Sequence, residues 1–375
     1  MSNSSQARAW VDIDLAALRA NYEAIRRIVG EGRAIIPMVK ADGYGLGAER
    51  VVRTLESAGP WGFGVATVDE GVALRRAGVR RPVVVFGPLA PQAVDAAAAA
   101  GLVATISDIA SMERWAAAAD RHGPLAFHVE IDTGMGRAGF DWRETAGWAD
   151  RMRAFSTERV RWTGVYTHFH SADAADATPT ITQWERFRDA VAQLPVSRED
   201  LLVHAANSAA ALRWAEVRAD AVRPGIWLYG GRAVEADVSG VPVPETVAGV
   251  RARVVRVRSV PPGTTLGYGA THVARGWERW ATLSIGYADG LPQSLANRGH
   301  ALLLGCRVPI VGRISMDMTV VEISAVPEAV PGDVGTLLGV DGESAMALDD
   351  VAAEAGTIAY AILTGLTARL PRLER

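Results

Sequence analysis

The chain has 375 residues, 49% of them hydrophobic and 22% charged, a composition that suits two globular domains or one large barrel with additions. Its formal net charge of −3 gives no electrostatic basis for binding nucleic acid or an anionic membrane, and its single cysteine excludes an intrachain disulfide. The longest mainly apolar run, residues 96–106, is well short of the ~20 residues that span a bilayer, and residues 1–8 form a short polar tail rather than a signal peptide. We therefore expect a cytoplasmic protein.

The first half of the chain alternates predicted strands with predicted helices. Residues 10–13 alternate like a strand, and Asp14 is placed to cap a helix whose apolar residues recur at helical spacing. Later helix-like stretches lie at 69–77, 91–100, 108–120 and 183–194. Eight apolar stretches are typical of buried strands: 35–40, 63–67, 82–87, 103–107, 126–132, 163–169, 201–206 and 222–229. This alternation predicts an α/β fold with a parallel sheet closed as a (β/α)8, TIM-type barrel, with an open doubly wound sheet as the alternative.

After about residue 240 the pattern changes to that of a mainly-β domain. Residues 241–244, with two prolines, predict a linker. Residues 250–258 alternate with period two and slip in phase at Val254 and Val255, which predicts an antiparallel strand with a bulge and a solvated row of arginines. Further strands are predicted at 280–287, 301–304, 308–314 and 319–323, and short helices at 348–355 and 359–366. We place the barrel at residues 13–240 and the β domain at 241–375.

One residue directs the search for chemistry. Lys40 is the only lysine among 39 basic residues, and it ends an apolar run before a glycine-rich loop. Arginine can replace a solvated lysine but cannot replace one whose amine must react, because guanidinium stays protonated and is a poor nucleophile. This predicts a lysine that binds an aldehyde, and pyridoxal phosphate is the usual biological aldehyde held in this way. The alternative is a chance survivor at the end of a strand.

Other polar residues follow the predicted strands at the end of the barrel where active sites form. They are Tyr44, Arg137, His168, His170, Asn207, Ser208, Arg223, Gly225 and Ile226. The hydroxyl of Ser208 and the amides of Gly225 and Ile226 suit a phosphate group. Two other interpretations are disfavoured. The G-x-G-x-x-G match at 134–139 lies in the fifth unit rather than the first, where a dinucleotide site belongs, and His168, His170 and His204 together only weakly suggest a metal site.

Eight stretches, in order, resemble the successive motifs of the alanine racemase family. They are VKADGYGLG (39–47), IDTGMGRAGF (131–140), THFHSAD (167–173), HAANSAA (204–210), RPGIWLYG (223–230), LGYGATHVA (266–274), SIGYADGL (284–291) and GRISMDMT (312–319). The resemblance covers nearly the whole chain. It implies a barrel followed by a β domain with which residues 1–12 pack, a homodimer with shared active sites, and production of D-alanine for peptidoglycan with pyridoxal 5'-phosphate as cofactor and no metal.

The resemblance also implies roles for individual residues. Lys40 would hold the cofactor and act as base on one face of the substrate, and Tyr268 of the partner subunit would be the base on the other. Arg223, bonded by His168, would contact the pyridine nitrogen, and Arg137 the cofactor phenolate and the substrate carboxylate. The phosphate would be held by Tyr44, Ser208, Gly225, Ile226 and Tyr360, with Asn207 as a further cofactor-binding residue. The partner would line the substrate pocket with Tyr287, Met316 and Asp317.

Three departures from the family pattern stand out. Many relatives carry a carbamylated lysine where this chain has Glu130, and we predict that Glu130 pairs with Arg137. Gly43 and Leu46 replace Ala and His in the loop after Lys40, which bears on loop stiffness and on hydrogen bonding around the site. The absence of a secretion signal favours alanine over a broader substrate range. Competing functions are an amino-acid decarboxylase, which would need an acidic partner at the pyridine nitrogen and a reactive cysteine such as Cys306, a metal hydrolase, and a non-catalytic cofactor carrier.

Overall fold

The computed structural model describes residues 6–235 and 238–375, so residues 1–5 of the predicted N-terminal segment and 236–237 of the predicted barrel lie outside the described residues. Parallel strands form a sheet whose order follows the chain from β3 to β10 and ends with β2 beside β10. A parallel bridge between Met38 and Gly64 joins the first strand to the second and closes the barrel. The barrel prediction is confirmed, and the open sheet is excluded. The strands are β2 (Ala34–Ile35), β3 (Phe63–Val65), β4 (Val83–Pro88), β5 (Val103–Ile106), β6 (Leu125–Asp132), β8 (Val160–Tyr166), β9 (Leu202–His204) and β10 (Ala221–Val222).

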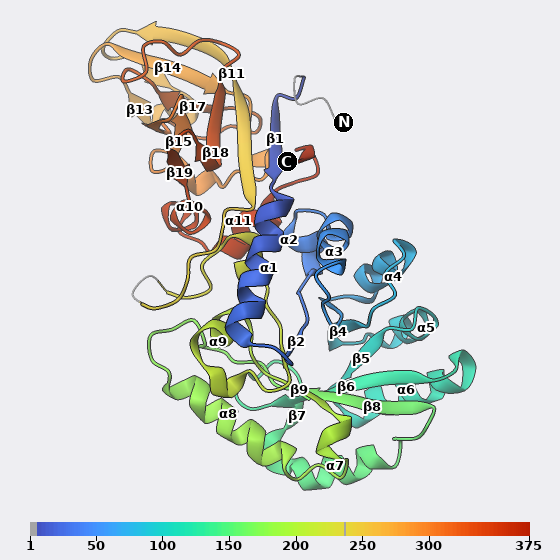
Figure 1. Cartoon of the computed structure of the whole chain (residues 1–375). Coiled ribbons are helices and arrows are strands. Elements are labelled where there is room, and N and C mark those ends of the chain that lie inside the picture. The colour runs from blue at the N-terminus through green and yellow to red at the C-terminus, as the bar shows by residue number, and fades with distance from the viewer. Residues whose placement is uncertain (1–5, 236–237) are drawn as a thin grey trace.

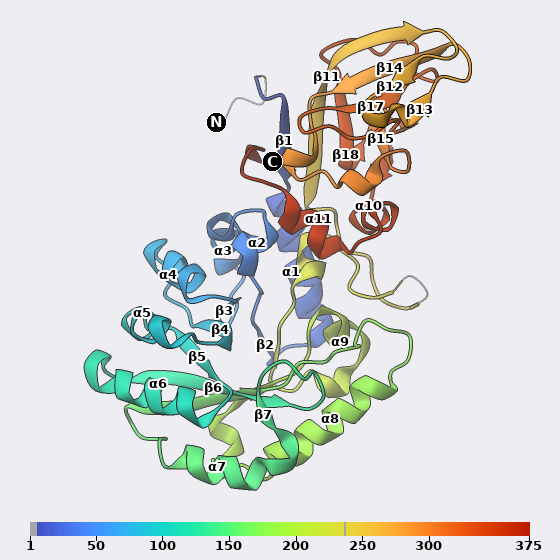
Figure 2. The same cartoon turned by 180° about the vertical axis from the view of Figure 1, so that it is seen from behind.

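Helices surround the barrel (Figures 1 and 2). As predicted, Asp14 caps the first of them, since its carboxylate accepts a hydrogen bond from the amide of Ala17. A capping box between Thr67 and Glu70 begins α4. No helix among the described residues is long and apolar enough to cross a membrane. The helices of this half are α1 (Leu15–Val29), α3 (Ala48–Glu56), α4 (Val68–Arg76), α5 (Val94–Ala99), α6 (Ile109–His122), α7 (Thr145–Arg153), α8 (Thr178–Val191) and α9 (Ser208–Arg213).

Several predicted strands are shorter than expected. Two of them keep only two residues of regular strand, and proline is the reason in both. The stretch 222–229 is a strand only as far as Val222; Ile226–Tyr229 is a 3-10 helix. Pro224 has no N–H for a sheet ladder, and Gly225 turns the backbone to φ −124° and ψ −101°. The stretch 35–40 likewise pairs regularly only over Ala34–Ile35, because Pro37 cannot donate either.

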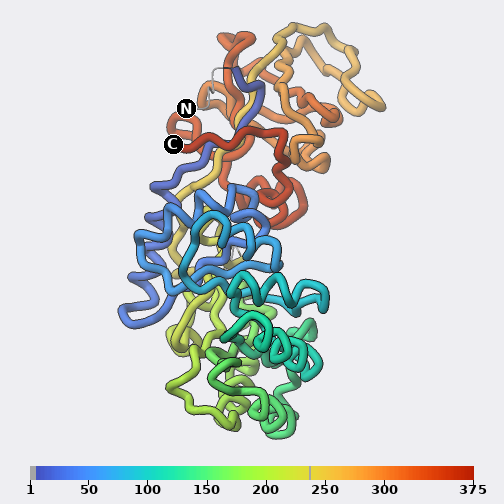
Figure 3. Tube along the Cα trace, turned by 90° about the vertical axis from the view of Figure 1, so that its right-hand side faces the viewer, coloured from blue at the N-terminus to red at the C-terminus, as the bar shows by residue number. Residues whose placement is uncertain are grey.

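The C-terminal part of the chain, together with β1 (Ala9–Ile13), forms a second sheet that extends from one end of the barrel (Figure 3). Its centre is β11 (Ala248–Val260), whose register with β14 shifts between Val254 and Arg256, as the phase slip predicts. The strand β1 is antiparallel to β11 and parallel to β20 (Arg372–Glu374), so segments near both ends of the described chain lie in this sheet. The other elements are β12 (Thr265–Leu266), β13 (His272–Val273), β14 (Glu278–Leu283), β15 (His300–Leu303), β16 (Cys306–Pro309), β17 (Thr319–Glu322), β18 (Val334–Asp341), β19 (Ser344–Met346), α10 (Leu348–Ala355) and α11 (Ala359–Gly365).

The predicted solvated row of arginines on β11 is wrong for Arg251. Its guanidinium is buried, with its Nε 3.0 Å from a carboxylate oxygen of Asp12 on β1. The side chains of the pair are 9% and 8% exposed. Strand alternation correctly predicts a polar position here, but the pairing of β1 with β11 supplies a counter-charge that lets the position be buried.

Asp12→Asn is expected to lower the free energy of unfolding by about 3 kcal/mol, because it keeps the shape of the side chain but leaves the Arg251 charge buried without a full counter-charge. Urea unfolding would measure the change. Asp141→Asn is the matched control, since Asp141 pairs with Arg143 on the surface, and it should lose less than about 1 kcal/mol. Equal losses in the two variants would contradict the argument.

Candidate active site

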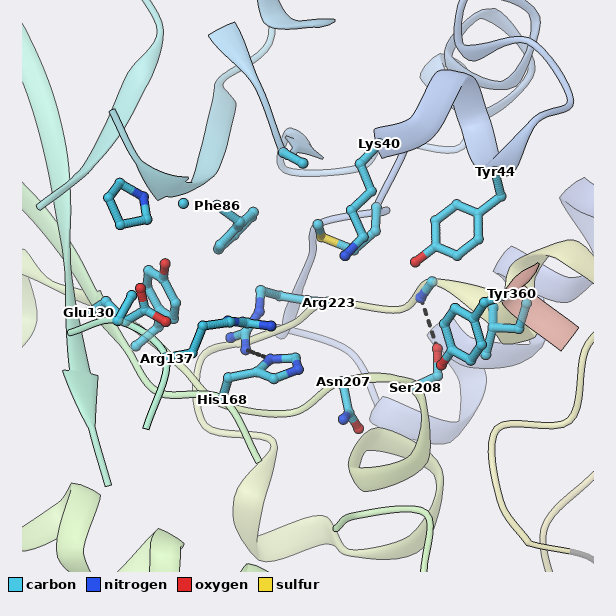
Figure 4. A pocket seen from close by; sticks show the side chains of 18 residues that line it. Lys40, Tyr44, Phe86, Glu130, Arg137, His168, Asn207, Ser208, Arg223 and Tyr360 are labelled. Atoms are coloured by element: carbon cyan, nitrogen blue, oxygen red, sulfur yellow. Dashed lines mark hydrogen bonds between the residues drawn. The ribbon is translucent and has the colours of Figure 1, made fainter. Parts of the chain in front are cut away.

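A cavity of about 430 Å³ lies where the C-terminal ends of the barrel strands converge (Figure 4). Lys40 enters it from the end of the first strand, and Arg137, His168 and Arg223 lie on the opposite side. The barrel thus brings together side chains that are far apart in the sequence. All of the residues predicted to bind cofactor line this cavity: Lys40, Tyr44, Arg137, His168, Asn207, Ser208, Arg223, Gly225, Ile226 and Tyr360.

Lys40 begins a short turn, α2 (Lys40–Tyr44), that the sequence predicts only as a glycine-rich loop. The backbone is left-handed there, with φ of 52° at Ala41, 52° at Asp42 and 56° at Tyr44. Such a conformation is strained for residues other than glycine, so it requires specific support. Glu70 of α4 accepts a hydrogen bond from the Ala41 amide at 2.7 Å, and the Asp42 carboxylate accepts one from the Ala48 amide at 2.8 Å. These bonds fix the direction in which Lys40 leaves the backbone.

The environment of the Lys40 amine favours its neutral form. Burial lowers the pKa of the ammonium, and the charge of Arg137 lowers it further, against a smaller opposing effect of Glu70. An amine with a lowered pKa is a better nucleophile and a better base near neutral pH. The position thus suits covalent binding of an aldehyde and proton transfer.

Arg223 is held at the bottom of the cavity by hydrogen-bond acceptors and by two aromatic rings, those of Phe86 and Tyr166. It donates to Nδ1 of His204 at 2.8 Å and to the carbonyl oxygen of Thr167 at 2.8 Å, and it lies 3.3 Å from Nδ1 of His168. Burial lowers the pKa of Arg223 to about 10, so it keeps its charge at neutral pH. Burial, and secondarily the charge of Arg223, lowers the pKa of His168 to about 3. The predicted contact between His168 and Arg223 is therefore present, with a neutral histidine as the acceptor.

His204 and His128 extend this hydrogen-bond network into the barrel. No pattern in the sequence indicates this extension. Because Nδ1 of His204 accepts from Arg223, its proton lies on Nε2, which is 3.1 Å from Nδ1 of His128. Burial lowers the pKa of both histidines, that of His128 to about 3. His170, in contrast, is exposed and bonds Ser171. In the part of the chain that the structure describes, no group of three or more His, Cys, Asp or Glu side chains could hold a metal ion.

Hydroxyl and amide groups gather at the other end of the cavity. The amide of Gly225 donates to Oγ of Ser208 at 2.8 Å, and a Cβ at Gly225 would lie only 2.2 Å from the hydroxyl of Tyr44. Burial raises the pKa of Tyr44, and raises that of Tyr360 to about 12, so both phenols remain protonated donors. Asn207 caps α9 by accepting from the Ala210 amide.

A second cavity, of about 500 Å³, lies on the C-terminal half of the chain. It contains the remaining predicted site residues Tyr268, Tyr287, Met316 and Asp317 together with Gln293, Arg313 and Ile314. None of these residues lines the Lys40 cavity. Tyr268 is carried by the turn of the β12–β13 hairpin and is 71% exposed.

Comparison with known proteins agrees with this arrangement. The family model of the alanine racemase N-terminal domain matches residues 13–233, and that of the alanine racemase C-terminal domain matches residues 247–374. The chain belongs to the alanine racemase family. A curated relative, the alanine racemase of Halothermothrix orenii, is 35% identical over 365 residues, which cover 97% of this chain and 96% of the relative. The resemblance predicted from the motifs is thereby confirmed, and the chain is an amino-acid racemase.

Solved structures of alanine racemases superpose on the whole chain. The E. faecalis enzyme has a TM-score of 0.91 at 30% identity, with 100% of each chain covered. The Bartonella henselae enzyme, solved with covalently bound pyridoxal phosphate, has a TM-score of 0.89 at 29% identity and covers 98% of this chain and 100% of its own. The fold shared with this family includes both the barrel and the mainly-β half.

The structure also explains two departures from the alanine racemase loop pattern. Gly43 has a φ of 62°, within the left-handed turn, so glycine relieves strain there. Leu46 is fully buried and packs in the core, so this position contributes apolar packing rather than a hydrogen bond.

At the third departure, the predicted direct pair between Glu130 and Arg137 is not formed. Among the described residues no ion pair joins Glu130 to Arg137. Glu130, Arg137 and Tyr166 all line the same cavity. Glu130 is nevertheless buried in the wall of the cavity, 5% exposed. Burial raises its pKa, although the charge of Arg137 and the nearby Tyr166 hydroxyl oppose this. Glu130 therefore acts on Arg137 through its charge, and Tyr166 is a cavity residue that the sequence does not reveal.

Proposed function

We propose that this protein interconverts L-alanine and D-alanine by a two-base proton transfer assisted by pyridoxal 5'-phosphate, and that the D-alanine supplies peptidoglycan synthesis. The observation that carries the proposal is the cavity in which the partly desolvated Lys40 amine faces Arg137 and Arg223. In the proposed division of the chain, residues 13–240 hold the cofactor and residues 241–375 supply the opposing base. Residues 6–12 of the proposed N-terminal segment pack with the β domain.

The cavity suits pyridoxal phosphate in its shape and in its donors. The bound cofactor would supply an aldehyde for the Lys40 amine and an electron-withdrawing ring that acidifies the Cα–H bond of alanine. The lack of a side chain at Gly225 leaves open the space beside the Tyr44 hydroxyl. Arg223, a permanent donor, would contact the ring nitrogen, and Arg137 would bind the phenolate oxygen and the substrate carboxylate. The groups proposed to hold the phosphate are the hydroxyls of Tyr44, Ser208 and Tyr360 and the amides of Gly225 and Ile226, with Asn207 capping the helix behind them.

Inversion at Cα needs one group that removes a proton from one face and another that delivers a proton to the opposite face. We assign these roles to Nζ of Lys40 and the hydroxyl oxygen of Tyr268. Burial lowers the pKa of the Lys40 ammonium and so favours the neutral amine, which can accept a proton. Arg137, which would bind the carboxylate, fixes the substrate between the two bases.

The exposure of Tyr268 supports a homodimer with shared active sites. Tyr268 and Met316 are 71% and 52% exposed, and Tyr287 and Asp317 line the same cavity. Aromatic and methionine side chains in such a cluster are typical of protein interfaces. We propose that a second copy of the chain covers this face and receives these side chains at the mouth of its own Lys40 cavity.

The proposal is tested by incubating the purified protein and pyridoxal phosphate with L-alanine, and separately with D-alanine, and following the optical rotation. Both solutions should approach zero rotation. An unchanged rotation, in folded protein shown by its absorption spectrum to hold the cofactor, would refute racemase activity. A parallel assay with serine would test whether alanine is the preferred substrate.

Glu130→Gln should stabilise the fold and strengthen binding of the substrate carboxylate. The pKa of Glu130 is higher in the folded than in the unfolded state, so its ionised form costs stability above the folded pKa, and this cost disappears below the unfolded value of about 4.3. The variant should thus gain unfolding free energy at pH 8, and the gain should shrink towards pH 4. Loss of the negative charge near Arg137 should remove a repulsion of the substrate carboxylate and lower the KM for alanine ~3–10-fold. Urea unfolding and racemisation kinetics measure the two effects, with exposed Glu49→Gln as control.

A further inference from the structure

A buried carboxylate lies two residues after Tyr287 of the second cavity but does not line that cavity. Asp289 is fully buried, and its two oxygens receive both terminal nitrogens of Arg8, at 2.5 and 3.0 Å. The amide of Gly286 donates to the same carboxylate at 3.0 Å, which closes the turn that carries Tyr287. Asp289 therefore holds the shape of this turn.

Arg369 connects this carboxylate to the neighbouring segment. Its Nε lies 3.5 Å from Asp289, and its terminal nitrogen lies 2.6 Å from Asp317. Backbone bonds already align the two segments, since the amides of Tyr287 and Ala288 donate to the carbonyl oxygens of Ser315 and Met316 at 3.1 and 3.0 Å. Among the described residues, Arg369 is the one side chain that bonds the carboxylate of Asp317.

The backbone that carries Arg369 is itself anchored on both sides. Thr367 donates from its amide to the Asp289 carbonyl oxygen at 3.1 Å and from its hydroxyl to that of Ala288 at 3.0 Å. Arg372 donates to the carbonyl oxygens of Leu366 at 2.8 Å and of Gly45, directly after the Lys40 turn, at 3.0 Å. Arg369 thus extends from a segment whose position is fixed by the barrel as well as by the β domain.

We propose that Arg369 is a positioning residue for the active site of the other copy in the dimer. It holds Asp317 and the Tyr287 turn in the relative arrangement that the neighbouring Lys40 cavity receives. The proposal rests on the shared-site function proposed above. It predicts that a substitution at Arg369 impairs the active site to which the substituted chain contributes Tyr268. The active site that contains Lys40 of the substituted chain should be unaffected.

The proposed role of Arg369 is tested in a mixed dimer that has only one complete active site. One chain carries Lys40→Ala and the other Tyr268→Phe, so that only the site combining the second chain's Lys40 with the first chain's Tyr268 is complete. Arg369→Met in the Lys40→Ala chain should raise the KM for alanine ~3–10-fold with little change in kcat, as expected when a partly exposed ion pair that orders a binding segment is lost. The same change in the Tyr268→Phe chain should leave KM unaltered.

Two further variants sharpen the result. Arg369→Lys in the Lys40→Ala chain should restore part of the lost affinity, because it keeps the charge near Asp317. Arg121→Met in that chain, which removes an exposed pair with Asp95 on the barrel surface, should have no effect. An equal effect of Arg369→Met in both chains, or none in either, would overturn the proposal. An inactive parent mixed dimer, assembled from chains whose wild-type form is active, would overturn site sharing and the role of Arg369 with it.

Discussion

Lys40→Ala is expected to reduce alanine racemisation by at least ~10³-fold, because it removes both the amine that would bind the cofactor and one of the two bases. This large effect is expected because of where the Lys40 side chain lies as well as because of its reactive amine. The left-handed turn after Lys40, supported by Glu70, directs the side chain into the cavity, and burial lowers the pKa of its ammonium. No other residue of the chain has a comparable amine.

The measurement uses the fact that the chain has one lysine. Borohydride reduction of the protein with bound pyridoxal phosphate, followed by digestion and mass spectrometry, should place a pyridoxyl group on the peptide that contains Lys40. The Lys40→Ala protein should show no such adduct on this peptide, and its urea unfolding should remain cooperative. Lys40→Arg is the matched control for charge, and it should also be inactive because guanidinium does not react. An active Lys40→Ala protein would refute the assignment.

Tyr268→Phe is expected to reduce racemisation by ~10²–10⁴-fold, the usual contribution of a positioned general acid or base. The ring remains, so packing at the proposed interface should change little, while the hydroxyl that exchanges the proton is lost. Lys40 should still exchange the Cα proton of one enantiomer. In D2O the variant should therefore incorporate deuterium into one enantiomer of alanine much faster than it converts that enantiomer into the other. Equal loss of exchange with both enantiomers would contradict a two-base arrangement.

Mixing the two inactive variants tests where Tyr268 acts. Random exchange of subunits makes half of the dimers mixed, and each mixed dimer has one complete site of two, so about one quarter of wild-type activity should return. Recovery on mixing would show that Lys40 and Tyr268 of one site come from different chains. Absence of recovery, in samples shown by mass to contain mixed dimers, would place both residues of a site in one chain. The exposure of Tyr268 and its separation from the Lys40 cavity argue against that outcome.

Much of this architecture can be read from the sequence because local patterns report burial. The apolar stretches predict the barrel strands, the alternation in β11 predicts its bulge, and Asp14 predicts the start of α1. The single lysine directs attention to Lys40, and parallel strands bring the residues after them to one end of the barrel. All of the predicted cofactor-binding residues consequently line one cavity, although their individual roles remain predictions.

Other features depend on contacts between segments that no local pattern encodes. The pairing of β1 with β11 turns Arg251 from an expected surface residue into half of a buried ion pair. The link from Arg223 through His204 to His128 exists only because three separate strands place these side chains together. Residue types and their spacing indicate which chemical groups the chain has available. The burial, tautomer and charge of each group depend on the neighbours that the closed fold places within hydrogen-bonding distance of it. For that reason the sequence predicts the barrel and its reactive lysine, and the three-dimensional arrangement reveals how Arg223, Glu130 and Arg369 are held.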